Sequence, residues 1–208
     1  YSPVILFSIW VWAMCLAWSV AQGSFAAGAF LILLAGASGV SMALVPREGA
    51  ELLSNLGFYG DRMAVWIEPN LHVHSGEQFR RAVALANQAG LLGTEVPVGA
   101  WTLPEVQNDM APSLFLARFG AIGAVVLLCL QFAFFGSCLF AGWLALRAGN
   151  GQNNWRAKRA GRFAFFSLWG GASLLCGHAL IAWGCNLGFL PVMGQPMPFV
   201  AAAGSLWG

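Results

Sequence analysis

Long apolar segments separated by short polar ones dominate the chain. No formal charge occurs in residues 1–46, 119–146 or 163–208. Because a helix needs about 20 apolar residues to cross the hydrocarbon core of a bilayer, this pattern is typical of membrane-spanning helices. The first apolar segment is too long for one crossing and breaks at Gln22-Gly23-Ser24. It therefore predicts a hairpin of two helices.

The pattern predicts an all-α polytopic membrane protein in which residues 1–208 form a single membrane domain. The expected spans are about 3–21, 25–45, 114–146, 163–187 and 199–208. The fourth should end near Gly188, because prolines follow it and proline disrupts the interior of a helix. The fifth begins close to the last residue, and the sequence starts at Tyr1 rather than Met. We therefore expect the sequence to be a fragment of a longer protein.

Composition agrees with a membrane protein. Charged residues make up 9% of the 208 residues and hydrophobic residues 59%, whereas charged residues are about 25% of ordinary soluble domains. A disordered segment would need low hydrophobicity. A nucleic-acid-binding protein would need a basic patch to contact phosphates. We therefore expect neither a disordered tail nor a nucleic-acid partner.

The position of the charges predicts the topology. All eight acidic residues lie in segment 47–112, whereas segment 147–162 holds five basic residues and no acidic one. Short loops rich in Lys and Arg stay in the cytoplasm. Segment 147–162 is therefore predicted as a cytoplasmic loop and 47–112 as a large loop on the opposite side, periplasmic or extracellular. Within that loop, residues 77–92 predict an amphipathic helix, since they place apolar side chains at helical spacing: Phe79, Ala82, Val83 and Ala86.

Asp109 is the acidic residue that is best placed for a catalytic role. It directly precedes the third expected span, so we expect it at the membrane surface. A carboxylate held there is placed to act as a general base. The alternative is a structural role, in which an Asp near a helix N-terminus is stabilised by capping and by the helix dipole.

The sequence does not predict a metal site. His72 and His74 form a pair in the large loop, but two ligands do not complete a site. The five cysteines lie in apolar segments and form no Cys-x-x-Cys pair, so they are interpreted as small buried side chains. His178 lies inside an expected span, where it serves either a function or a hydrogen bond to a neighbouring helix.

Two segments carry motifs. Residues 186–200 read NLGFLPVMGQPMPFV and residues 103–109 read LPEVQND. Both resemble motifs of the RodA/FtsW family, the shape, elongation, division and sporulation glycosyltransferases of bacterial cell walls. The first is similar to the last periplasmic loop of the family, and the matching positions are Asn186, Gly188, Pro191, Gly194 and Pro198. The second is similar to the family's Leu-Pro-Glu-x-His/Gln-Thr/Ser/Asn-Asp. The resemblance covers nearly all of the sequence but only the C-terminal half of the family.

The resemblance implies a multi-pass protein of the bacterial inner membrane that polymerises lipid II into glycan strands during cell-shape or cell-division processes. Asp109 matches the family's essential Asp, which implies general-base activation of the acceptor's sugar hydroxyl. The resemblance also implies substrate-binding roles near the pyrophosphate or sugars for Gln107, Asn108, Glu105 and Arg62. It further implies a divalent cation (Mg or Mn) that helps neutralise the leaving pyrophosphate, and a class B penicillin-binding protein as a partner.

The chain departs from the family pattern at two motifs. Ala201-Ala202-Ala203 stands in place of Ser-Tyr-Gly, and Ala117-Arg118 in place of an acidic pair. Met110, Ala111 and Pro112 replace Phe and aliphatic residues. Two alternatives to an active polymerase therefore stay open. One is a catalytically inactive paralogue that acts as a membrane scaffold in an envelope or cell-wall assembly. The other is a lipid flippase, with His178 as the only ionisable group inside a span.

Overall fold

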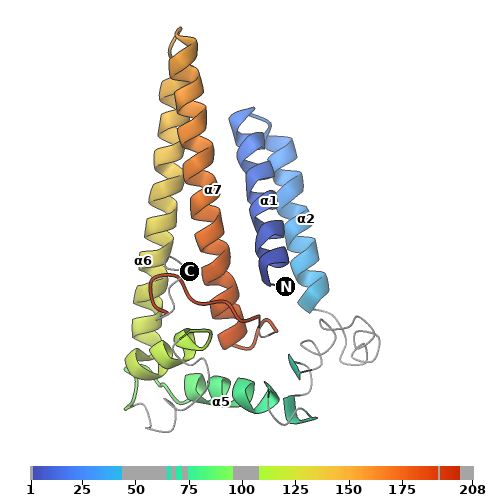
Figure 1. The fold of residues 1–208 in the computed structure, drawn as a ribbon, viewed down its shortest axis with the longest axis vertical. Helices are drawn as coiled ribbons and strands as arrows, with labels where there is room; N and C mark the ends of the chain where they lie inside the picture. The colour runs from blue at the N-terminus through green and yellow to red at the C-terminus, as the bar shows by residue number, and fades with distance from the viewer. Residues whose placement is uncertain are drawn as a thin grey trace. The chain divides into compact units, whose positions relative to one another are not determined.

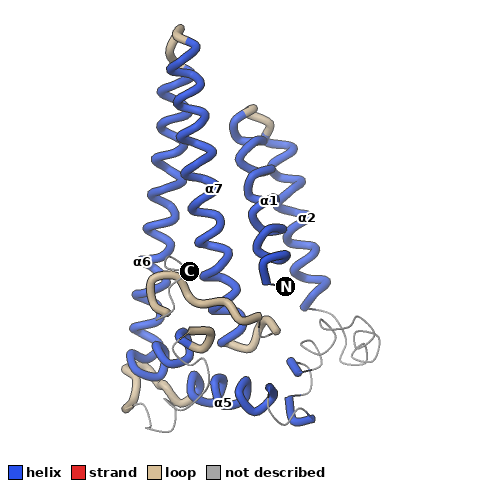
Figure 2. Tube along the Cα trace, in the orientation of Figure 1, coloured by secondary structure: helices blue, strands red, loops and turns tan. Residues whose placement is uncertain are grey.

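Helices are the only regular elements in the part of the chain that the structure describes. The computed structural model describes residues 2–43, 65–66, 69–71, 75–95, 108–191 and 193–201. Its α-helices are α1 (Ser2–Ala21), α2 (Phe25–Ala43), α5 (Ser75–Asn87), α6 (Ala111–Asn150) and α7 (Trp155–Asn186), and the short 3-10 helix η2 (Pro69–Leu71) precedes α5 (Figures 1 and 2). The all-helical prediction is confirmed for these residues.

The chain forms two compact units. The first comprises Pro3–Val45 and Leu130–Gly177, and the second comprises Pro46–Cys129 and His178–Gly208. The first unit therefore contains α1, α2, the end of α6 and the beginning of α7. The second contains α5, the beginning of α6, the end of α7 and the segment that follows it.

In the first unit, α6 and α7 approach each other closely through small residues. A Cβ atom added to Gly149 would lie 3.1 Å from the Cα of Gly161, and Gly142 faces the backbone of Phe165. Close backbone approach at small residues is typical of helix packing in membranes. The buried side chains of Ala17, Leu146 and Phe165 form the core of this unit.

The helices α6 and α7 are long and apolar enough to cross a membrane. In the most apolar 18-residue stretch of each helix, only 17% is buried in α6 and 33% in α7. The helical core of a water-soluble protein would be mostly buried. Large side chains such as Phe132 and Leu130 instead lie on the exposed surface of α6. Both helices therefore have the length and the outward apolar surface of helices in lipid.

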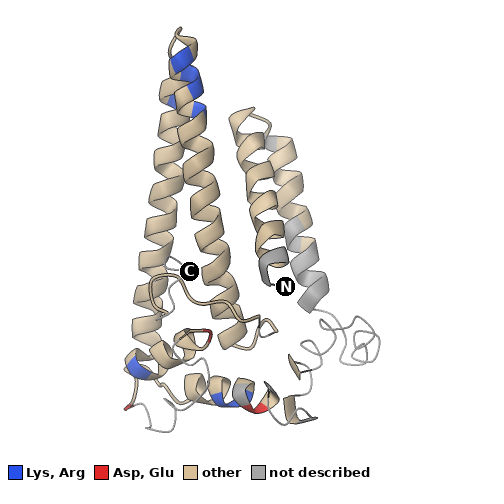
Figure 3. Ribbon diagram, in the orientation of Figure 1, with Lys and Arg blue, Asp and Glu red and all other residues tan. Residues whose placement is uncertain are grey.

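The segment 147–162, expected as a loop, is mostly helical. Helix α6 continues to Asn150 and α7 begins at Trp155, so the turn consists of residues 151–154. The Oδ1 atom of Asn154 accepts a hydrogen bond from the backbone N–H of Arg156 at 3.0 Å and caps α7. The guanidinium of Arg147 lies over the ring of Trp143, 4.3 Å from its centroid. The basic residues gathered at this turn (Figure 3) thus sit on exposed helix surfaces.

The amphipathic helix α5 is shorter than residues 77–92 predicted, but its buried face is the expected one. It begins at Ser75 and ends at Asn87, and Phe79, Ala82 and Ala86 are buried. Residues 88–92 form turns instead of a further helical turn. The reason is the contact that this segment makes with α6.

Helix α6 is interrupted at Gly120, which has φ 68° and ψ −173°. The freed backbone N–H groups of Ala121 and Ile122 donate to the carbonyl oxygens of Gly90 and Leu91 at 3.0 and 3.1 Å. The N–H of Thr94 donates to the carbonyl oxygen of Ala117 at 2.8 Å. The loop after α5 therefore supplies backbone partners for the polar groups at the break in α6.

The fifth expected span lies largely outside the described residues. The structure describes the chain as far as residue 201, and residues 198–200 form a turn in which Phe199 has φ 69°. No helix begins in the described part of this segment, before residue 202.

Candidate functional site

The start of α6 places Asp109 at the edge of the second unit. Asp109 lies in the turn 108–110 directly before the helix and is half-buried. The following side chains of Met110, Ala111 and Ser113 are buried, and Pro112 is fully buried. Proline fits the first helical turn, where its missing N–H would have no partner within the helix. The backbone that carries Asp109 is therefore anchored by the buried residues that follow it.

Asn186, the last residue of α7, connects this helix to the start of α6. Its Nδ2 group donates to the backbone carbonyl oxygen of Asp109 at 2.8 Å and to that of Ala182 at 2.9 Å. Its Oδ1 atom accepts from the Oγ and the N–H of Ser113 at 2.7 and 3.3 Å. The Asn186 side chain is 2% exposed. Both donors and both acceptor positions of the amide are thus used inside the protein.

The chain leaves α7 through a glycine that ends the helix. Gly188 has φ 79°, and the N–H of Phe189 and the N–H of Gly188 donate to the carbonyls of Gly184 and Cys185 at 2.9 and 3.3 Å. This is the Schellman arrangement, which favours glycine because of its left-handed conformation. The indole N–H of Trp66 donates to the carbonyl oxygen of Gly188 at 2.8 Å. The end of α7 is therefore fixed by contacts from the large loop.

The segment after α7 returns to the Asp109 carboxylate. Gly194 has φ 60°, and a Cβ atom added there would lie 3.1 Å from Oδ2 of Asp109. Met197 and Pro198 are fully buried, and Met197 packs with Trp183 of α7 in a buried cluster. The carboxylate thus lies against the backbone of a glycine whose neighbours are held in the core.

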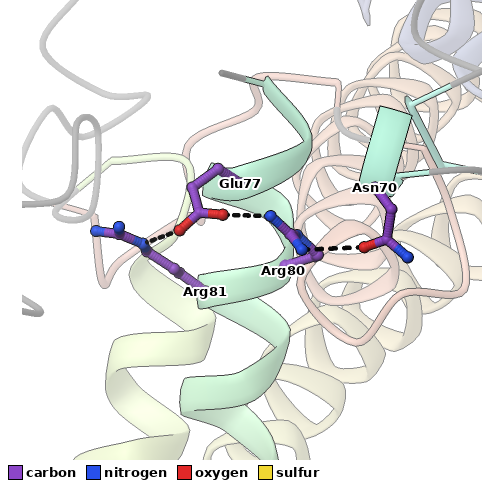
Figure 4. A network of polar contacts seen from close by, with 4 residues as sticks. All are labelled: Asn70, Glu77, Arg80 and Arg81. Carbon is purple, nitrogen blue, oxygen red and sulfur yellow. Dashed lines mark hydrogen bonds and ion pairs between the residues drawn. The ribbon is translucent and has the colours of Figure 1, made fainter. Parts of the chain in front are cut away.

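A second cluster of polar side chains lies on and beside α5. The side chain of Glu77 accepts from Nε of Arg81 at 2.7 Å and also contacts Arg80, which donates to Oδ1 of Asn70 at 3.0 Å (Figure 4). The hydrogen bond from Arg81 lowers the pKa of Glu77, and the positive charges of Arg81 and Arg80 add to this effect. Because these groups are largely exposed, the pairs contribute little to stability individually.

The structure describes two of the five predicted site residues. Asp109 and Asn108 occupy the turn before α6, whereas Gln107, Glu105 and Arg62 lie outside the described residues. His72 and His74 also lie outside them. Within the described ranges, no three His, Cys, Asp or Glu side chains are grouped to hold a metal ion. The divalent cation that the resemblance implies stays a prediction.

The sequence prediction missed Ser113 and the role of Asn186. Asn186 was identified only as a matching motif position, and Ser113 was not singled out. A signal was present, because buried polar side chains at the ends of apolar helices must find hydrogen-bond partners. An Asn at the end of one span and a Ser at the start of another are such a pair.

Comparison with known proteins gives the family. The model of the family described as cell cycle proteins, which comprises FtsW, RodA and SpoVE, matches residues 2–207. The chain belongs to this family. The predicted resemblance is thereby confirmed, and with the apolar helices α6 and α7 it makes the chain a membrane protein of the FtsW/RodA/SpoVE family.

Curated relatives carry the name "Probable peptidoglycan glycosyltransferase FtsW". The protein of Marinomonas mediterranea is 35% identical over 104 residues, which are 50% of this chain and 23% of the relative. That of Alcanivorax borkumensis is 29% identical over 104 residues, 50% of this chain and 24% of the relative. That of Saccharophagus degradans is 27% identical over 149 residues, 70% of this chain and 36% of the relative. The chain thus spans between 23% and 36% of the length of these relatives.

Proposed function

We propose that this chain is part of a peptidoglycan glycosyltransferase that polymerises lipid II, with Asp109 as the general base. One observation carries the proposal. The two motifs that resemble the family lie 77 residues apart in sequence, and they meet in a hydrogen bond between Asn186 Nδ2 and the backbone oxygen of Asp109. Gly194 of the second motif also lies against the Asp109 carboxylate.

The proposed reaction uses a fixed carboxylate. The sugar hydroxyl of the acceptor gives its proton to Asp109 while its oxygen forms a bond to the anomeric carbon of the donor. The bond from that carbon to the lipid pyrophosphate breaks, and the pyrophosphate leaves with the electron pair. A base whose backbone is held by buried residues meets the acceptor in one orientation, which lowers the entropic part of the barrier.

The proposed membrane arrangement places Asp109 at the periplasmic surface of the inner membrane. In this proposal residues 1–208 form one membrane domain with five spans, and the basic end of α6 and α7 lies in the cytoplasm. The part of α6 from Ala121 to Asn150 is about 45 Å long at 1.5 Å per residue. A hydrocarbon core is only about 30 Å thick, so the basic turn projects from it. Lipid II as substrate and a class B penicillin-binding protein as partner belong to the same proposal.

The test is polymerisation of lipid II by the full natural protein, reconstituted with its partner. Asp109→Asn preserves the size of the side chain and removes the base. We expect the rate to fall by a factor of about 10² to 10⁴, the usual contribution of a general base. Glu95→Gln is the matched control, since Glu95 is exposed, and it should retain the parent rate. Equal rates for Asp109→Asn and the parent would show that Asp109 is not the base.

A non-catalytic scaffold is the second candidate, and one observation favours it. Ala117, which stands where the family has an acid, is 1% exposed and packs against Leu85 of α5. The packing leaves no polar environment for a carboxylate there. The scaffold proposal expects no polymerisation by the parent protein and no phenotype for Asp109→Asn in cells. It also expects complex formation to depend on the lipid-facing surfaces of the helices.

A further inference from the structure

The loop Gly90–Thr94 is fastened to the break in α6 more tightly than a surface loop requires. Three backbone hydrogen bonds connect it to Ala117, Ala121 and Ile122, with lengths of 2.8 to 3.1 Å. At the contact, Gly93 and Gly120 touch backbone to backbone. A Cβ atom on Gly93 would collide with the carbonyl oxygen of Arg118, and one on Gly120 would collide with the carbonyl oxygen of Leu91. The position of the loop along the axis of α6 is therefore fixed.

The tip of this loop is apolar and exposed. Leu91 is 70% exposed and Leu92 is 79% exposed. The neighbouring surface of α6 is apolar as well, with Phe119 and Ile122 more than half exposed. The carbonyl of Leu91 accepts a hydrogen bond from the N–H of Ile122. The leucine pair therefore lies beside the apolar surface of α6 that Phe119 and Ile122 form. Two adjacent exposed leucines that continue an apolar helix face mark an interaction site.

The polar groups around the tip mark a membrane boundary. Arg118 and Glu95 are exposed, and α6 carries no further charge from residue 119 to residue 146. Arginine side chains at such a position extend their guanidinium toward lipid headgroups. The leucine pair is on the uncharged side of Arg118, because Leu91 is bonded to Ile122. The leucine pair therefore lies beside the uncharged part of α6.

The backbone hydrogen bonds pair part of the loop's polar backbone within the protein. Irregular backbone exposed to lipid does not occur within the hydrocarbon region, so the backbone of such a loop stays at the membrane boundary and only its side chains reach the acyl chains. Here the carbonyls of Gly90 and Leu91 accept from α6, and the N–H of Thr94 donates to it.

We propose that the side chains of Leu91 and Leu92 form a tip that inserts into the acyl chains of the outer leaflet beside α6. The tip would hold α5 at the lipid surface. The inference rests on α6 crossing the membrane and not on Asp109 acting as a base. A failure of the polymerisation test would leave it unchanged.

The test is the membrane depth of a spin label in the full natural protein, in nanodiscs of phosphatidylethanolamine and phosphatidylglycerol. The native cysteines are replaced by alanine, and one label is attached through Leu92→Cys or, separately, Leu91→Cys. Phe132→Cys, on the 60% exposed Phe132 of α6, is the lipid-facing reference. Asn87→Cys, on the exposed surface of α5, is the water-facing reference. Collision with oxygen, which concentrates in lipid, is compared with collision with a water-soluble nickel chelate.

We expect the ratio of oxygen to nickel collisions at Leu92 and Leu91 to exceed that at Asn87 and to approach that at Phe132. A ratio equal to that at Asn87 would place the tip in water and overturn the proposal. Low collision rates with both reagents would show that protein covers the tip, which would also overturn it. The two leucine positions report independently, so a single variant that fails to fold leaves the other as the test.

Discussion

Replacing Asn186 with alanine should destabilise the site more than any exposed polar substitution. The change removes the amide that pairs with the backbone oxygen of Asp109 and with the N–H and Oγ of Ser113. The hydroxyl of Ser113 can rotate toward another acceptor. The N–H of Ser113 loses its partner in a buried place, and the carbonyl oxygen of Asp109 loses one in a partly buried place. At about 1 to 3 kcal/mol for each stranded group, the expected loss is roughly 2 to 6 kcal/mol. The lower end is favoured, because hydrogen bonds in membrane proteins are worth about 0.6 kcal/mol on average.

The assay is reversible unfolding of the purified protein in mixed micelles, followed by polymerisation at a temperature where the variant is folded. Asn87→Ala is the control, since Asn87 is exposed and its loss should stay within about 0.5 kcal/mol. Ser113→Ala removes one of the partner groups, and combining it with Asn186→Ala should cost less than the sum of the two single changes. Additive costs, or an Asn186→Ala variant as stable as Asn87→Ala, would refute the reasoning.

Three further substitutions test other contacts. Gly194→Ala and Gly188→Ala both replace a glycine with positive φ, but only at Gly194 would the added Cβ lie 3.1 Å from Oδ2 of the proposed base. Gly194→Ala should therefore lower polymerisation far more than Gly188→Ala, and equal rates would contradict the assigned contact. Gly93→Ala should unfold at a lower denaturant concentration than Gly90→Ala, because Gly90 has open space around it and Gly93 meets the backbone of α6. The same unfolding midpoint for both variants would contradict this contact between Gly93 and α6. The pKa of Glu77 is lowered in the folded state, so the ionised Glu77 stabilises the fold above the ordinary pKa of glutamate, and this contribution is lost as the pH falls through the lowered value. Glu77→Gln should therefore lose less stability than the parent on acidification. Parallel plots of unfolding free energy against pH would exclude this contribution.

The positions of the helices could be predicted from the sequence because they follow from the lengths of its apolar segments. The turn at Gln22-Gly23-Ser24 and the two helices around it lie where the pattern expected them, since Gly23 adopts φ 69° there. The end of α7 also follows from local chemistry, because Gly188 terminates it. Membrane insertion of these helices remains a prediction.

The break in α6 could not be predicted from its hydrophobic pattern. Gly120 lies in a continuous apolar segment, and glycine is common within membrane helices. The interruption depends on backbone partners offered by Gly90 and Leu91, which lie about 30 positions earlier in the sequence and carry no side-chain signal for this contact. The helical nature of segment 147–162 was missed for a related reason. Basic residues predict which side of the membrane a segment occupies, not whether it is helical.

Within the candidate site, the sequence identified the residues but not their contacts. Asp109 and Asn186 stood in separate motifs, and spacing along the chain does not say that one amide would bind the backbone of the other residue. The contact between Gly194 and the Asp109 carboxylate depends on the path of the chain after α7, which the buried Met197 and Pro198 determine. Such a path follows from packing and not from local propensity.

The hydrogen bond between Asn186 and Asp109 has a consequence for biosynthesis. Asp109 leaves the ribosome well before Asn186, the residue 77 positions later that fixes its backbone. The growing chain therefore carries the carboxylate for some time without this hydrogen bond, and a chain terminated before residue 186 keeps Asp109 but cannot form the bond. The order of synthesis thus delays this hydrogen bond until α7 has been made and folded.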